Sequence, residues 1–202
     1  MKPKPPLRSL VLSSFGWAAA GTGGQALFQL AALAIFARLL SPAEFGVVSA
    51  ATIITQLSQI FNEFGIGPAI VQRKKLSDAD IQVGFTLSCL FGGIVMLTLW
   101  TSSPMLAEVL HVPELTWVIR AYTVVFALKS YSAVAESLMQ RELEFRLLAR
   151  TDTISFALGY AGLGILCALY GLSYWSLVVA HLCQSAIKTG LVLRYRSHSK
   201  AI

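Results

Sequence analysis

Long apolar runs separated by short polar connections dominate the chain. Six runs approach or exceed the roughly 20 residues that an α-helix needs to span a bilayer. They cover residues 10–37, 45–71, 81–100, 115–139, 154–170 and 174–193. Helix-capping patterns precede two of them, from Ser41 to Glu44 and from Ser77 to Asp80, with a serine three positions before an acid. The pattern predicts an all-α integral membrane protein with six transmembrane helices.

Basic residues occur at alternate connections between these runs. Three cations lie in each of the N-terminus, the second connection, the fourth connection and the C-terminal tail: Lys2, Lys4, Arg8; Arg73, Lys74, Lys75; Arg141, Arg146, Arg150; Arg194, Arg196, Lys200. The other three connections offer only Arg38. By the positive-inside rule, both termini are expected in the cytoplasm. We therefore divide the chain into a cytoplasmic N-terminus (1–9), a transmembrane lobe (10–193) and a cytoplasmic basic tail (194–202).

Composition supports this reading and excludes other classes. The chain is 55% hydrophobic and only 13% charged, roughly half the charged fraction of a soluble domain. Its net charge of +6 does not indicate a nucleic-acid partner, because the cations punctuate apolar runs instead of forming a basic patch. The first run begins like a signal peptide, but its uncharged stretch is longer than a signal sequence uses, which favours an uncleaved helix.

The connections are too short to form a soluble catalytic domain. The sequence lacks a Gly-rich phosphate loop, a His-Glu metal motif and a Gly-x-Ser-x-Gly elbow. We therefore expect a protein that is not an enzyme and that needs neither a metal nor a cofactor.

Charged residues inside the spans are the best candidates for function, because a charge at the centre of a transmembrane helix costs roughly 2.5 to 3.5 kcal/mol. The fourth run contains Arg120, Lys129 and Glu136. Lys129 and Glu136 are seven residues apart and share a helix face. Lys129 would either attract an anionic substrate or form a structural ion pair, with Glu136 or another acid. Arg120 would either line a cavity or reach the membrane surface as an anchor.

Other charged residues lie near predicted cytoplasmic helix ends, where solvated or capping roles are the simpler interpretation. These are Glu63, Asp152 and Lys188. A set of small residues, Gly84, Ser88 and Gly92, recurs every four positions in the third run. This spacing predicts close packing between helices.

Two clusters are hinge or gating candidates: Gly21, Gly23, Gly24, Gly65, Gly67 and Pro68. The first cluster lies in the middle of a predicted span, where a hinge and a packing notch are equally expected. The second lies where the second span closes before a basic cluster. Its glycines permit a bend, and its proline removes a backbone donor.

Three segments carry a resemblance to a known family. They are residues 37–88 (beginning ARLLSPAEFG), 112–128 (VPELTWVIRAYTVVFAL) and 138–150 (LMQRELEFRLLAR). Together they resemble the polysaccharide, or O-antigen (lipopolysaccharide), flippases of the multidrug, oligosaccharidyl-lipid and polysaccharide exporter superfamily. Such proteins have at least twelve helices in two lobes, so the resemblance implies that this chain supplies the N-terminal half.

The resemblance also implies a function. A flippase moves a lipid-linked oligosaccharide or polysaccharide precursor across the bacterial plasma (inner) membrane for polysaccharide biosynthesis, by alternating access. Its cavity is hydrophilic and often cationic, so Lys129 and Arg120 would meet the substrate phosphate while the lipid tail stays among membrane lipids. The second lobe would come from a missing C-terminal continuation, which we favour, or from a homodimer partner.

Three alternatives remain open from the sequence. A drug or small-molecule exporter of the same superfamily would be favoured by acids deep in the first run, which has none. A membrane-embedded polysaccharide polymerase or ligase would be expected to have a larger outer loop. A nonfunctional truncated fragment is the third.

Overall fold

The computed structural model describes residues 26, 28–63, 66–73 and 76–199. All regular secondary structure in these residues is helical. After a helical segment, Phe28–Leu39, the elements are α2 (Pro42–Glu63), α3 (Ile66–Gln72), α4 (Asp78–Val109), α5 (Leu115–Arg141), α6 (Phe145–Ser155), the π-helix η1 (Phe156–Leu163), α7 (Gly164–Leu169) and α8 (Trp175–Ser199).

Within the described residues, four helices are long and apolar enough to cross a membrane. They are α4, α5, the continuous helix Phe145–Leu169 formed by α6, η1 and α7, and Trp175–Tyr195 of α8. The third to sixth predicted spans are thereby confirmed as helices, although two were predicted too short. α4 continues to Val109 with Pro104 inside it, and the fifth span begins earlier, at Phe145.

Neither of the first two predicted spans is described as one continuous membrane-spanning helix. Most of the run 10–37 lies outside the described residues. The run predicted as one helix over 45–71 is divided between α2, which ends at Glu63, and α3, which begins at Ile66.

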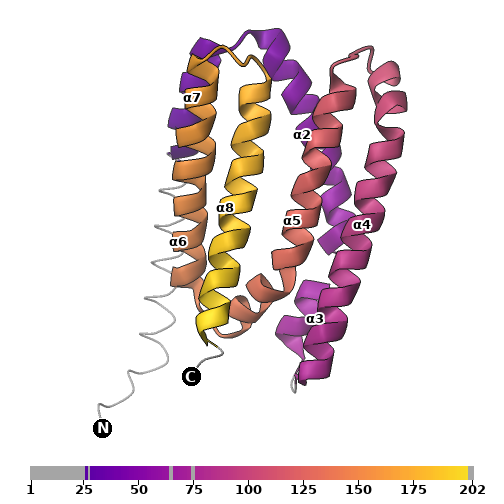
Figure 1. Ribbon diagram of the computed structural model, residues 1–202, viewed down its shortest axis with the longest axis vertical. Coiled ribbons are helices and arrows are strands. Elements are labelled where there is room, and N and C mark those ends of the chain that lie inside the picture. The colour runs from indigo at the N-terminus through magenta and orange to yellow at the C-terminus, as the bar shows by residue number, and fades with distance from the viewer. Residues whose placement is uncertain (1–25, 27, 64–65, 74–75, 200–202) are drawn as a thin grey trace.

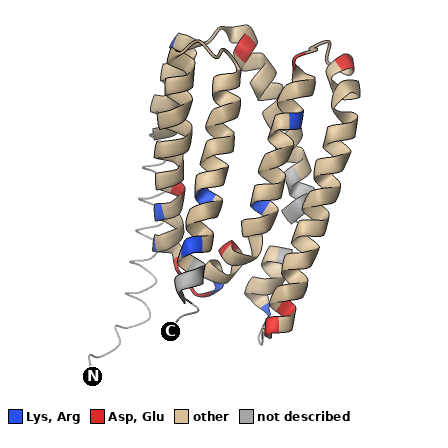
Figure 2. Ribbon diagram, viewed as in Figure 1, with Lys and Arg blue, Asp and Glu red and all other residues tan. Residues whose placement is uncertain are grey.

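The long helices stand side by side in an up-and-down bundle, with α5 packed against α2, α3, α4 and α8 (Figure 1). One end of the bundle carries the end of α3, the start of α4, the α5–α6 connection and the end of α8; we call it the basic end. The opposite end carries the α4–α5 and α7–α8 connections. Most Lys and Arg in the described residues gather at the basic end (Figure 2), which is the segregation that the sequence predicted.

Both predicted helix caps are confirmed. The Asp80 amide donates to Ser77 Oγ at 3.2 Å, and the Ser77 amide donates to Asp80 Oδ2 at 3.0 Å. At the start of α2, the Ser41 amide donates to Glu44 Oε2 at 2.6 Å, and Ser173 from the α7–α8 connection donates to Glu44 Oε1. The hydrogen bonds from Ser173 and Ser41 lower the pKa of Glu44, because they stabilise its ionised form.

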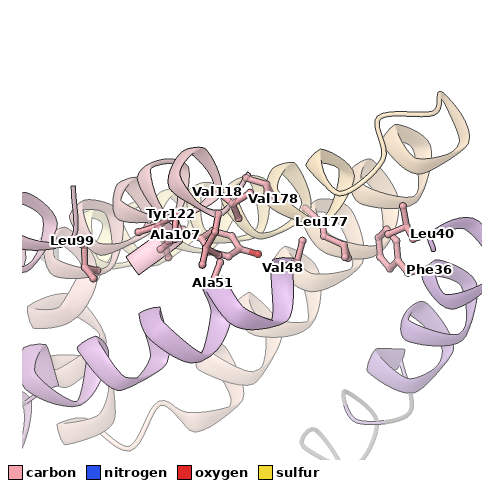
Figure 3. Close-up of a cluster of buried hydrophobic side chains, with 14 of the residues drawn as sticks. Phe36, Leu40, Val48, Ala51, Leu99, Ala107, Val118, Tyr122, Leu177 and Val178 are labelled. Atoms are coloured by element: carbon pink, nitrogen blue, oxygen red, sulfur yellow. The ribbon is translucent and has the colours of Figure 1, made fainter. Parts of the chain in front are cut away.

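The interior changes character along the bundle. The main apolar core includes Val118 and Tyr122 of α5, Val48 of α2 and Val178 of α8 (Figure 3). It also includes Ala107, Leu115 and Leu177, which lie beside the connections at the opposite end. In the second half of α5 the buried residues include serines at 130, 132 and 137. The opposite end is thus packed with apolar side chains, and the polar part of the α5 interior lies toward the basic end.

Small residues allow the closest helix contacts. Gly84, Ser88 and Gly92 are all buried on α4, and a Cβ at Gly92 would lie 1.9 Å from Ser130 Oγ of α5. The predicted packing stripe is therefore confirmed at the α4–α5 contact, because a methyl group at Gly92 would overlap Ser130.

Candidate functional site

Three helices place polar or aromatic residues on one face each, at helical spacing. The sets are Tyr122, Lys129 and Glu136 on α5; Asp152, Phe156 and Tyr160 on α6 and η1; and His181, Gln184 and Lys188 on α8. Residues at these spacings lie on one side of a helix. Because α8 packs against both α5 and η1, the three faces can surround a common space.

The common space contains two cavities. A cavity of about 590 Å³ lies between α2, α5, η1 and α8, and its lining includes Thr55, Tyr122 and His181. A second cavity, of about 490 Å³, lies beside α3, and Gly67 and Pro68 contribute to its wall. Three residues line both cavities: Lys129, Ser185 and Lys188. The cavities therefore adjoin at two cationic side chains.

A network of charges joins three helices beside these cavities. Lys188 Nζ of α8 lies 3.1 Å from Glu136 Oε2 of α5 and 2.9 Å from Asp152 Oδ1 of α6. Ser132 Oγ donates a 2.9 Å hydrogen bond to the other Glu136 oxygen. The sequence interpretation of Asp152 and Lys188 as solvated or capping residues was wrong. The structure pairs them, and Glu136 is paired with Lys188.

Replacing Lys188 by alanine is expected to lower the free energy of unfolding by about 1–3 kcal/mol, because two carboxylates would lose their shared cation. The side chains are only partly exposed, at 30% for Lys188 and 22% for Glu136, so the loss exceeds that of a surface pair. Unfolding in mixed detergent micelles measures it, with Arg150→Ala at an exposed position as control. Adding Glu136→Gln to the Lys188→Ala variant should restore part of the lost free energy of unfolding, because one of the two carboxylates is then neutral. Equal stability of all these variants and the unaltered protein would contradict the pairing.

Lys129 is the most central of the three candidates that the sequence singled out. It lies near the middle of α5, roughly 20 Å from either helix end. Its side chain is exposed where it lines the two cavities. Glu136, about two helical turns further along α5, lines the second cavity.

Arg120 is placed elsewhere by the structure. Its Nε donates to Ser103 Oγ at 3.1 Å, and its guanidinium lies against Trp100 and Trp117. It lines neither of the two cavities. Of the hinge candidates, Gly67 and Pro68 lie in α3, whereas Gly21, Gly23, Gly24 and Gly65 lie outside the described residues: the structure does not address them.

Aromatic rings form one wall of the larger cavity. The His181 ring contacts Tyr122 at 5.4 Å and Tyr160 at 5.0 Å, both edge to face. Tyr160 also stacks on Phe156 at 5.0 Å. These rings fix one another by packing, so the wall is preformed.

The sequence reasoning did not name Tyr160 and did not recognise Lys188 and Asp152 as residues of the site. The available signal was the recurrence of polar and aromatic residues at helical spacing in the fifth and sixth spans. In the described part of the chain, no group of three His, Cys, Asp or Glu residues could hold a metal ion.

The fold and cavity define an all-α membrane protein whose apolar helices enclose a polar, partly cationic interior. Comparison with known sequences gives the family: residues 35–201 match the family described as polysaccharide biosynthesis protein. The chain belongs to this family.

Three curated bacterial relatives illustrate it. The lipopolysaccharide biosynthesis protein WzxC of Escherichia coli K12 is 25% identical over 91% of this chain, and the succinoglycan biosynthesis transport protein ExoT of Rhizobium meliloti is 30% identical over 88%. The teichuronic acid biosynthesis protein TuaB of Bacillus subtilis is 24% identical over 80%. The chain covers 37%, 35% and 33% of these relatives, about a third of their length. No solved structure matches the chain significantly.

Proposed function

We propose that this chain forms one lobe of a flippase that moves a lipid-linked oligosaccharide or polysaccharide precursor across the bacterial plasma membrane. The observation that carries the proposal is the pair of adjoining polar cavities around Lys129, inside helices that are otherwise apolar. A polar interior of this kind suits a hydrophilic group that must cross the bilayer while its lipid tail remains outside.

The lobe would have six transmembrane helices. The predicted spans 10–37 and 45–71 would join the four apolar helices, with residues 1–9 and 194–202 as cytoplasmic ends. The gathering of cations at one end supports this orientation. A second lobe, from a continuation of the chain or from a second copy, would close the cavity and bring the fold to at least twelve helices.

Lys129 is the residue that we assign to the substrate. It lies near the middle of α5 and lines both cavities. An ammonium group near the membrane centre would attract the phosphate that links sugar and lipid. Gly67 and Pro68, in the wall of the second cavity, would let α3 shift as substrate enters from the basic end.

The test is deletion of the gene in the source organism, followed by complementation. We expect the mutant to lose its surface polysaccharide and to accumulate the lipid-linked precursor on the cytoplasmic leaflet, and we expect the intact gene to restore both. A mutant with normal surface polysaccharide but increased sensitivity to toxic organic compounds would instead support a small-molecule exporter. Loss of polymer length with normal export of single repeat units would support a polymerase or ligase.

A further inference from the structure

The α4–α5 hairpin holds one arginine between two tryptophans near the opposite end of the bundle. The guanidinium carbon of Arg120 lies 5.4 Å from the Trp100 ring centroid and 5.1 Å from the Trp117 ring centroid. Its Nε donates to Ser103 Oγ at 3.1 Å. These contacts define what we call the Arg120 cluster: Trp100, Ser103, Trp117 and Arg120.

The serine of this cluster is fixed by the proline that follows it. Pro104 has no amide hydrogen, so the Trp100 carbonyl loses its usual helical donor. Ser103 Oγ donates to that carbonyl at 2.9 Å and accepts the hydrogen bond from Arg120. Because Ser103 is fully buried, its hydroxyl orients Arg120 from inside the bundle.

The cluster lies on the bundle surface at the level of an aromatic belt. Trp100 and Trp117 are 41% and 60% exposed, and Tyr170 and Trp175 are exposed at the same end. Exposed tryptophan and tyrosine concentrate at the headgroup level of membrane proteins. Arg120, in the second turn of α5, therefore lies close to the depth of lipid phosphates.

Arg120 has no carboxylate partner among the described residues. The acids at this end include Glu44, which accepts hydrogen bonds from Ser41 and Ser173. A guanidinium has five in-plane donors, of which Ser103 uses one, and the guanidinium carbon lies over both tryptophan rings. The two terminal nitrogens form a fork whose geometry matches a phosphate.

We propose that the Arg120 cluster binds the phosphate of a phospholipid in the leaflet at the opposite end of the bundle. The phosphate would supply the counter-charge that the described residues lack, and the exposed tryptophan rings would pack against the upper acyl chains. This lipid site is separate from the two cavities and does not depend on the transported substrate.

Native mass spectrometry of the purified protein, titrated with phosphatidylglycerol, tests the proposal. Arg120→Gln should weaken binding of the most tightly retained lipid about tenfold, because one charge-assisted bidentate contact is lost. Arg120→Lys should bind with intermediate affinity, since it keeps the charge without the fork. Arg38→Gln, an exposed arginine toward the same end, should bind like the unaltered protein.

Three results would overturn the proposal. The first is equal binding by the unaltered protein and Arg120→Gln, with both melting at the same temperature. The second is equal retention of diacylglycerol with the same acyl chains, which would mean that only the apolar part is recognised. The third is displacement of the lipid by a similar concentration of inorganic phosphate, which would assign the site to a soluble anion.

Discussion

Replacing Gly159 by alanine is expected to lower the free energy of unfolding by about 3 kcal/mol or more, the largest effect of any single methyl group that we anticipate. In η1, a Cβ at this position would lie 2.4 Å from the Gln184 amide nitrogen and 2.5 Å from its Cα. The neighbour is backbone and cannot rotate away. The π-helix and α8 would have to separate, and the wall formed by Tyr160 and His181 would separate with them.

Gly93→Ala is the matched control. A Cβ at Gly93 meets nothing within 4 Å, so alanine should be neutral or should stabilise α4 by up to about 1 kcal/mol through its higher helix propensity. Unfolding in mixed detergent micelles compares the two variants. Equal stability of Gly159→Ala and Gly93→Ala would show that η1 and α8 do not touch as described.

Replacing Lys129 by methionine is expected to reduce transport by tenfold or more, with unchanged abundance in the membrane. Methionine keeps an unbranched side chain of nearly the same length and removes the charge, and one charge-assisted contact with phosphate is worth roughly 1.5–3 kcal/mol. The variant is placed in the complete gene product, in cells that lack the native gene, and surface polysaccharide is measured over time.

Two further variants separate charge from packing. Lys129→Arg should retain most of the transport because it keeps a cation between the two cavities. Arg150→Met removes a cation from an exposed position of α6 and should leave the rate unchanged. Normal transport by Lys129→Met would remove Lys129 from the substrate path, while equal losses in Lys129→Met and Arg150→Met would point to overall charge.

Helix content and charge segregation could be predicted because both are local properties of the sequence. An apolar run of sufficient length forms a helix in a membrane whatever its neighbours, and a serine three residues before an acid caps it. The residues at which the helices begin and end were less predictable. The third run predicts a helix that ends at residue 100, but Ser103 donates to the carbonyl that Pro104 leaves without a donor, and α4 continues to Val109.

The site was only partly predictable for a different reason. Periodicity places Lys129 and Glu136 on one face of α5, and both line the second cavity. The partner of Glu136 comes from α8, so the pairing depends on which helices are neighbours. One sequence without the tertiary arrangement does not contain that information, which is why Lys188 and Asp152 were interpreted as separate helix-end residues.

The most direct test of the flippase proposal is lipid-linked oligosaccharide movement in liposomes that contain the complete gene product. A fluorescent substrate is distributed over both leaflets, and a membrane-impermeant reductant bleaches only the label that reaches the outside. We predict that bleaching goes nearly to completion, at a rate that falls in Lys129→Met. Bleaching that stops at the outer-leaflet fraction, as in protein-free liposomes, would contradict the proposed function.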